Sequence, residues 1–245
     1  MSVTGRPERE YRSAQREGTP ITAAPRLRAS AALARATMLT SLALCTLCAL
    51  APLPASAGAQ VEEALSASVQ SSLHRAVSDF PAAKLNFVSE AEGDAWLREM
   101  ARRLAPKIPD WPTRRDFLIT VQYEASRAGL DPQLVLGLIQ HESNFRKFAV
   151  SPADARGYMQ VMPFWVRLIG SKDQNLFNLR TNLRYGCTIL RHYLDRENGD
   201  YYRALGRYNG SLGRPEYPNA ILANWTQNWS WTYDARCRAG VWCGK

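Results

Sequence analysis

The chain has 245 residues, of which 46% are hydrophobic and 22% are charged. This length allows one domain with an extension rather than two full domains, and the composition excludes a wholly disordered chain. The formal net charge is +9, but residues 1–57 carry seven basic and three acidic residues, and the remainder has 24 basic against 19 acidic. No basic block is dense enough to favour a nucleic-acid partner.

The first predicted element is an export signal. Seven arginines within residues 1–35 precede an apolar run over 38–50, and Ala55-Ser56-Ala57 follows. A basic stretch, a short apolar stretch and an A-x-A site make up a secretory signal. About 13 apolar residues are too few to cross a bilayer core of roughly 30 Å as a helix. We therefore assign 1–59 to a signal peptide or leader, with an uncleaved membrane anchor as the less favoured alternative.

Residues 60–110 are predicted to form a helical N-terminal extension. Helix-forming composition covers 61–77 and 90–104. Three prolines, at positions 106, 109 and 112, then indicate a linker. The main domain is expected from residue 111 to residue 245, with a tryptophan-rich tail.

Capping residues define the first helices of this domain. Thr113 is a candidate N-cap with Asp116 three residues later, and Gly129 follows as a stop signal. Asp131 is then predicted to cap a second helix that has Pro132 at its first position. This second helix carries the residue on which the functional interpretation depends.

The later helices are predicted over 179–194, 200–208 and 219–225. The first of them has one apolar stripe, at offsets of 4, 7 and 11, formed by Leu183, Cys187, Leu190 and Leu194. Period-2 patterns typical of strands are nearly absent, so the fold class is mainly α.

Three cysteines follow the leader. Cys187 lies on the apolar stripe and is expected to be a buried thiol. Cys237 and Cys243 enclose five residues and are a candidate disulfide in an oxidising compartment. Because no histidine lies near this pair, we expect no metal site. We also expect no cofactor, since the sequence has no glycine-rich phosphate loop.

Glu142 is the most unusual position in the predicted second helix. Val135, Ile139 and Glu142 are spaced by 4 and 3, so they share one face. A carboxyl that emerges from an apolar stripe has a raised pKa, of about 6 in the best-known cases, and can donate a proton near neutral pH. The alternative is a structural glutamate that pairs with Arg146.

The surrounding sequence favours the catalytic alternative. The ordered elements are Glu142-Ser143-Asn144-Phe145, Gly157-Tyr158-Met159-Gln160-Val161-Met162-Pro163 and Ala204-Leu205-Gly206-Arg207-Tyr208-Asn209-Gly210. Together they resemble the soluble lytic transglycosylase (SLT) family over about residues 117–225. The resemblance implies a lysozyme-like catalytic domain that cleaves peptidoglycan in the periplasm.

The resemblance also implies roles for individual residues. Glu142 is expected to be the catalytic acid and base, which cleaves the MurNAc–GlcNAc bond and closes a 1,6-anhydro ring. Substrate-binding roles are expected for Ser143, Gly157, Tyr158, Met159, Gln160, Tyr208 and Asn209. Tyr208 is expected to donate a hydrogen bond to Glu142, and Tyr158, where the family usually has leucine, is expected in the cleft.

One carboxylate is expected to suffice for the reaction. Ordinary glycosidases use a pair of carboxylates, and substrate-assisted enzymes are an exception. Asp154, the only acidic residue soon after Glu142, is interpreted as a loop residue paired with Arg156. Neither His141 nor His192 has a serine or cysteine partner arranged for nucleophilic catalysis.

Three functions remain to be distinguished. The first is a carbon–oxygen lyase, the lytic transglycosylase, and the second is a hydrolytic muramidase with the same acid. The third is an inactive protein that binds or assembles the wall. The expected partners are peptidoglycan strands, and the protein is expected to be a monomer. The sequence does not decide between general wall turnover and a role beside an envelope machine.

Overall fold

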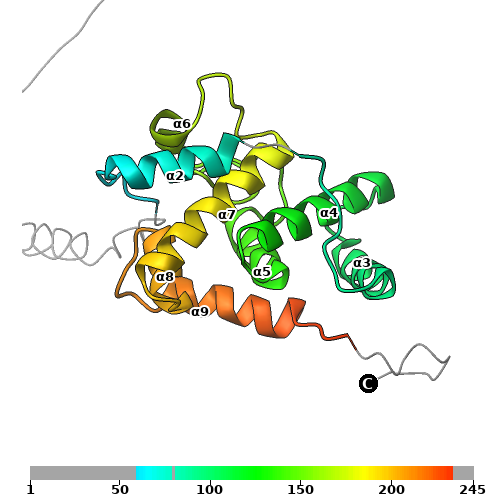
Figure 1. Ribbon diagram of the computed structural model, residues 1–245. Helices are drawn as coiled ribbons and strands as arrows, with labels where there is room; N and C mark the ends of the chain where they lie inside the picture. The colour runs from blue at the N-terminus through cyan, green and yellow to red at the C-terminus, as the bar shows by residue number, and fades with distance from the viewer. Residues whose placement is uncertain (1–58, 79–80, 234–245) are drawn as a thin grey trace, which may run out of the picture. The chain divides into compact units, whose positions relative to one another are not determined.

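The computed structural model describes residues 59–78 and 81–233, which belong to one compact unit. Residues 1–58 of the predicted leader and the Cys237–Cys243 pair lie outside these residues. The described helices, labelled in Figure 1, are α2 (Ala67–Ser78), α3 (Glu90–Leu104), α4 (Trp111–Arg127), α5 (Pro132–Ser143), α6 (Phe164–Ile169), α7 (Leu179–Arg196), α8 (Tyr201–Tyr208), α9 (Glu216–Ala223) and the π-helix η1 (Asn224–Trp229). In the described ranges, β-structure is limited to isolated bridges. The mainly α class is therefore confirmed.

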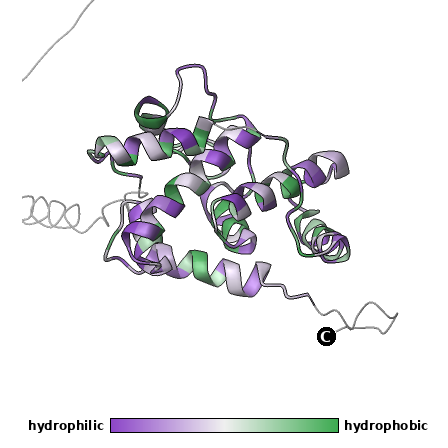
Figure 2. Ribbon diagram, viewed as in Figure 1, coloured by the Kyte–Doolittle hydropathy of each residue, from purple (hydrophilic) through white to green (hydrophobic). Residues whose placement is uncertain are grey.

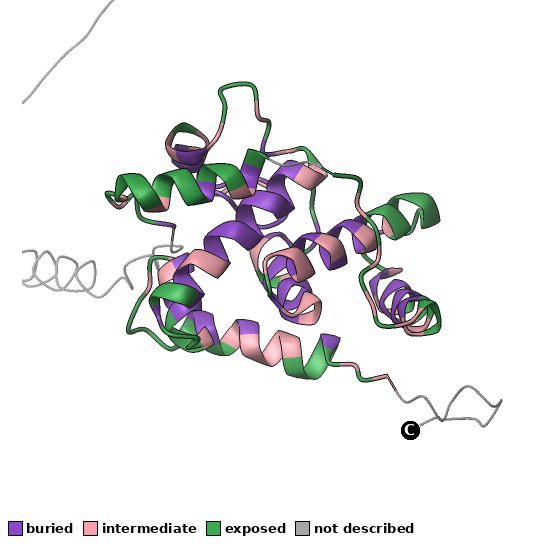
Figure 3. Ribbon diagram, viewed as in Figure 1, coloured by how far each residue is buried: buried purple, intermediate pink, exposed green. Residues whose placement is uncertain are grey.

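Helix α7 lies at the centre of the unit. It contacts α2, α4 and α8 (Figure 1), and it is buried along most of its length (Figure 3). Most helices combine hydrophobic and hydrophilic residues (Figure 2), so each can bury one face against its neighbours. Helix α5 contacts α4, α9 and η1. This packing fixes the position of α5, which carries Glu142.

Several predicted elements are confirmed. Helix α3 has the predicted bounds, and α5 begins at Pro132 with Asp131 as its N-cap, whose carboxylate accepts a hydrogen bond from the Gln133 N–H. Gly129, at φ +66°, follows the end of α4. All four residues of the predicted stripe on α7 are buried, Cys187 among them. Local patterns therefore define these elements correctly.

Other boundaries were predicted wrongly. Asp110, rather than Thr113, caps α4, because its carboxylate accepts a hydrogen bond of 2.9 Å from the Thr113 N–H. The first helix begins at Ala67, and residues 60–66 are not helical. The last predicted helix begins earlier, at Glu216, and continues into η1. Helix α6 was not predicted.

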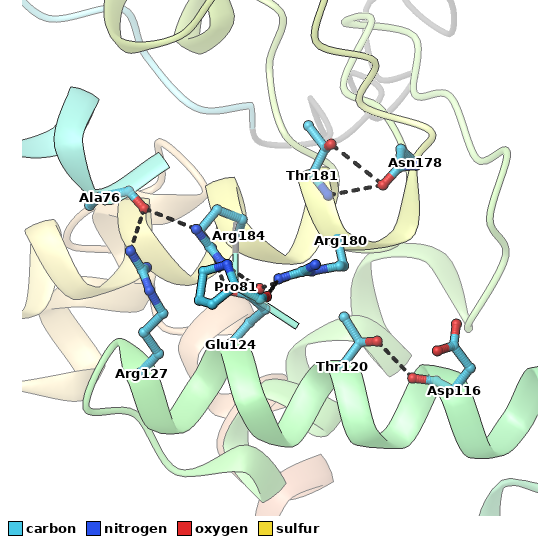
Figure 4. A network of polar contacts seen from close by, with 10 residues as sticks. All are labelled: Ala76, Pro81, Asp116, Thr120, Glu124, Arg127, Asn178, Arg180, Thr181 and Arg184. Atoms are coloured by element: carbon cyan, nitrogen blue, oxygen red, sulfur yellow. Dashed lines mark hydrogen bonds and ion pairs between the residues drawn. The ribbon is translucent and has the colours of Figure 1, made fainter. Parts of the chain in front are cut away.

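A buried ion pair connects the central helices (Figure 4). The side chains of Glu124 on α4 and Arg184 on α7 are fully buried, and the Arg184 guanidinium donates to both carboxylate oxygens. Arg127 donates to the Ala76 carbonyl at 2.8 Å, which connects α2 to α4. Arg180 donates to the Pro81 carbonyl. The network thus fastens residues of the predicted extension to the main domain.

The structure contains no described helix that is both long and apolar enough to span a membrane.

Candidate active site

Glu142 lies in the last turn of α5, where the chain then turns sharply. Asn144 and Phe145 both have positive φ, of 50° and 64°. Asparagine tolerates this left-handed conformation, whereas phenylalanine rarely adopts it. The Phe145 ring is 5% exposed and packs against Phe117 and Trp229, at centroid distances of 5.9 and 5.5 Å. Core packing of Phe145 therefore holds the turn that ends α5 directly after the glutamate.

Glu142 lines a pocket of about 350 Å³. This volume lies near the lower end of the range for small-ligand sites, about 300–1,000 Å³. Its lining residues are Ala59, Gln60, His141, Glu142, Ser151, Ala155, Gln160, Tyr208, Asn209, Glu216 and Tyr217. The pocket thus joins the end of α5 to the 151–160 loop, the end of α8, the start of α9 and the segment before α2.

The environment of Glu142 favours a protonated carboxyl. Burial raises its pKa to about 7, although a hydrogen bond from the Tyr217 hydroxyl to Oε1 acts in the opposite direction. No ion pair among the described residues includes Glu142. Arg146, the alternative partner considered from the sequence, donates from Nε to the Ser143 carbonyl at 3.0 Å. Near pH 7 the carboxyl can therefore hold a proton and release it.

His141 does not add a positive charge beside this carboxyl at neutral pH. Partial burial lowers the pKa of its imidazole below the usual range. The ring packs edge to face on Tyr217, with a centroid distance of 5.1 Å. A neutral imidazole does not lower the pKa of Glu142, as a nearby cation would.

A tight loop supplies the opposite wall of the pocket. Gln160, at φ 47°, donates its side-chain amide to the Gly157 and Ala149 carbonyls at 2.9 and 3.2 Å. Asn182 on α7 accepts from the Met159 N–H at 2.8 Å. Gly157 has φ +75°, and a Cβ there would lie 2.4 Å from the Asn182 amide nitrogen. Only glycine fits this position, so the backbone conformation explains why residue 157 is a glycine.

The structure brings together four of the eight residues predicted for the site. Glu142, Gln160, Tyr208 and Asn209 line the pocket, whereas Ser143, Gly157, Tyr158 and Met159 do not. Ser143 is buried and donates to the Ile139 carbonyl at 3.2 Å. Tyr158, expected in the cleft, is 6% exposed and packs on Phe117 at 4.9 Å. Ser143, Gly157, Tyr158 and Met159 therefore lie outside the pocket lining.

The hydrogen-bond partner of Glu142 differs from the expected one. The Tyr208 hydroxyl donates to the Met159 carbonyl at 2.8 Å, and Tyr217 on α9 supplies the bond to Glu142. Sequence reasoning missed Tyr217, because it lies 75 residues from the glutamate and follows no local pattern. Asp154 pairs with Arg156 at 2.9 Å, in agreement with its interpretation as a loop residue.

Two further pocket residues were also missed. Gln60 lies in the segment before α2, and Glu216 opens α9 with an exposed side chain. Glu216 is a second carboxylate at the edge of the pocket. None of the described residues forms a cluster that could hold a metal ion.

Comparison with known proteins identifies the domain. Residues 119–220 match the family model described as "Transglycosylase SLT domain". The resemblance expected from the sequence is confirmed over these residues.

Similar proteins carry related names. A "Transglycosylase" of Enterobacteria phage PRD1 is 31% identical over 112 residues, which cover 43% of this chain and 41% of that protein. A "Membrane-bound lytic murein transglycosylase C" of Haemophilus influenzae (strain PittEE) is 45% identical over 115 residues, 40% of this chain and 32% of the relative. The chain thus spans less than half the length of either relative. The solved lytic transglycosylase Slt from Pseudomonas aeruginosa is 16% identical, covers 75% of this chain and 36% of that chain, and has a TM-score of 0.36.

Proposed function

We propose that this protein is a peptidoglycan lytic transglycosylase that cleaves the MurNAc–GlcNAc β-1,4 bond and forms 1,6-anhydroMurNAc. The observation that carries the proposal is the carboxyl of Glu142, which lies in a pocket without a cation partner and has its pKa raised to about 7. An acid with a pKa near the working pH is the group that general acid catalysis requires. The SLT-domain match and the names of the relatives support the same substrate.

In the first step Glu142 acts as an acid. Its proton passes to the glycosidic oxygen as the bond between that oxygen and C1 of MurNAc breaks, and GlcNAc leaves with a hydroxyl group. The acetamido group of MurNAc stabilises the cationic C1, as in substrate-assisted glycosidases. The Tyr217 hydroxyl then donates to the newly formed Glu142 carboxylate.

In the second step Glu142 acts as a base. Its carboxylate removes the proton of the MurNAc 6-hydroxyl, and this oxygen bonds to C1 to close the anhydro ring. The reaction needs no external water, because the nucleophile belongs to the substrate and is held close to C1. The proton returns to Glu142, so the enzyme is ready for another cycle.

The remaining pocket residues are proposed to hold the glycan. Gln160, Tyr208 and Asn209 line the pocket, and amide and phenol groups suit hydrogen bonds to sugar hydroxyls. Ser143, Gly157, Tyr158 and Met159 are proposed to shape this surface from beneath. Their role is indirect, because none of them lines the pocket.

Mass analysis of a purified wall digest tests the chemistry. The wild type is expected to release products that end in anhydroMurNAc, and Glu142→Gln is expected to lose about 10²–10⁴-fold in rate, the usual contribution of a positioned acid–base group. Glu90→Gln, on the exposed first turn of α3, is the matched control and should keep the wild-type rate. Unchanged clearing by Glu142→Gln would show that another group is the acid.

A hydrolytic muramidase is the second candidate, and Glu216 is the observation that favours it. A second carboxylate at the pocket edge is what a hydrolase needs to activate water. In that case the digest contains reducing-end MurNAc, and Glu216→Gln removes the activity. A folded wild type that binds wall polymer without cleaving it would indicate the third candidate, an inactive binding or assembly protein.

Location, domain organisation and partners follow from the same proposal. We place the protein in the periplasm, exported by the signal in residues 1–59, whose A-x-A site at 55–57 would leave Ala59 on the mature chain. The relatives named membrane-bound support a membrane anchor as the alternative. Residues 60–110 are proposed as an extension of the 111–245 catalytic domain. The protein is proposed to act as a monomer on glycan strands, and no nucleic-acid partner is proposed. A protein of an envelope machine is the further candidate partner.

A further inference from the structure

A short segment before α2, residues 59–63, lies against the candidate active site. We call it the N-terminal strap. Ala59 and Gln60 line the same pocket as Glu142, although about 80 residues separate them in sequence. The position of the strap is not explained by the proposed chemistry, which uses neither residue.

Gln60 fastens the strap to one wall of the pocket. Its side chain is 6% exposed. The amide oxygen accepts from the Met162 N–H at 3.1 Å, and the amide nitrogen donates to the Gln160 carbonyl at 3.3 Å. The Gln60 amide also interacts with the Tyr208 hydroxyl. A buried polar side chain with satisfied hydrogen bonds on both amide atoms occupies a defined position.

The strap also touches the end of α8. Gly210, directly after the pocket residue Asn209, has φ +67°, and a Cβ there would lie 2.2 Å from the Ala59 carbonyl oxygen. Farther along, Glu62 pairs with Arg167 at 3.2 Å, and Glu63 pairs with Arg196. The strap therefore extends from the end of α8 to the loop that contains Gln160.

A segment that lines a pocket and is held to two of its neighbouring elements can restrict a polymeric substrate. A glycan strand can pass through a groove that is open at both ends, but only a strand terminus fits one that is closed. We propose that Gln60 is a specificity-determining residue, which together with the strap closes one end of the glycan groove. The enzyme would then cut at a fixed distance from strand ends. The inference rests on the proposed glycan-cleaving function.

Product lengths from purified glycan strands test this inference. In the first minutes of digestion the full chain should release one short product of uniform length. Gln60→Ala removes the hydrogen bonds of the Gln60 side chain, so we expect the uniform product to be lost and longer, mixed fragments to appear at the same extent of cleavage. Thermal melting of each variant checks that the domain is folded.

Gly210→Ala provides an independent displacement of the strap. The new methyl group would clash with Ala59, so the same change of product length is expected without any change to Gln60. Gly213→Ala is the matched control, because Gly213 also has positive φ, +88°, but has open space around its Cβ position. It should keep the uniform product.

Two results would overturn the inference. One is a wild-type distribution of lengths from folded Gln60→Ala and Gly210→Ala. The other is a faster reaction with unchanged lengths, which would make the strap an inhibitory segment. A shift in length with reducing-end products would retain the strap inference while contradicting the anhydro-sugar chemistry. A wild type that cleaves no glycan would contradict both.

Discussion

Two glutamates, one fully buried and one partly buried, have opposite surroundings in this protein. The Glu124 side chain is fully buried and receives hydrogen bonds from Arg184, which joins α4 to α7 (Figure 4). Glu142 lies in the pocket, where its partner is the neutral hydroxyl of Tyr217. The partner, rather than burial alone, therefore decides what such a carboxyl does. With a guanidinium it fastens helices, and without a cation it can hold and transfer a proton.

The largest effect on stability is expected at the paired glutamate. Glu124→Gln leaves the Arg184 guanidinium buried without its counter-charge, so the free energy of unfolding should fall by about 3–5 kcal/mol. Urea unfolding at pH 7 measures the loss. Activity per folded molecule should remain at the wild-type level, because Glu124 is not part of the pocket.

Glu99→Gln is the matched control for this change. Glu99 pairs with Arg102 and Arg103 on α3, and its side chain is 26% exposed. Surface pairs contribute about 0–1 kcal/mol. If the two substitutions cost the same, the Glu124–Arg184 pair has no special structural role.

The second effect is a pH-dependent stability at the unpaired glutamate. The pKa of Glu142 rises from 4.5 to about 7 in the folded protein, so the folded state binds the proton more tightly than the unfolded state. Stability contributed by this group is therefore present below about pH 4.5 and lost as the pH rises to about 7.

Glu142→Gln removes this loss of stability. Between pH 5 and pH 8, the free energy of unfolding of the variant should rise relative to that of the wild type by up to about 3 kcal/mol. The gain is smaller to the extent that solvent reaches the carboxyl. Urea unfolding at the two pH values measures the difference. A difference that stays constant with pH would show that the carboxyl has an ordinary pKa.

The smallest effect is expected from the hydroxyl that contacts Glu142. The Tyr217 hydrogen bond lowers the pKa of the carboxyl, so Tyr217→Phe should raise it by about one unit, the equivalent of one net hydrogen bond. The rate of the wild type should decline above about pH 7 as Glu142 loses its proton, and in the variant this decline should begin about one pH unit higher.

Tyr208→Phe supplies the comparison for that profile. It removes a phenolic hydroxyl from the same pocket, but this hydroxyl donates to the Met159 carbonyl instead of Glu142. The alkaline decline should therefore stay at its wild-type pH. An equal shift in both variants would indicate a general change in the pocket rather than the loss of the Glu142 bond.

The sequence was sufficient to predict the helix that carries Glu142. Asp131 and Pro132 define its start, and the apolar spacing of Val135 and Ile139 identifies the face from which the carboxyl emerges. These signals lie within about three turns of one another. Caps and helical faces depend on near neighbours in the chain, so they can be predicted without coordinates.

The partners of Glu142 could not be predicted in the same way. Tyr217 and Gln60 come from α9 and from the segment before α2, and only the packing of the whole unit brings them to the pocket. The assignment of the hydrogen bond to Tyr208 failed for the same reason, since tyrosines nine residues apart both reach this region. Such contacts are set by tertiary packing, which a single sequence does not specify.

The last turn of α5 has an electrical consequence for the proton on Glu142. The glutamate is the penultimate residue of the helix, where the aligned peptide dipoles place about half a negative charge. A carboxylate at this end is disfavoured by about 0.3–1 kcal/mol, which adds to the effect of desolvation. Part of the raised pKa is thus determined by the backbone. A glutamate moved to another position in a protein would keep this part of the shift only at the carboxyl end of a helix.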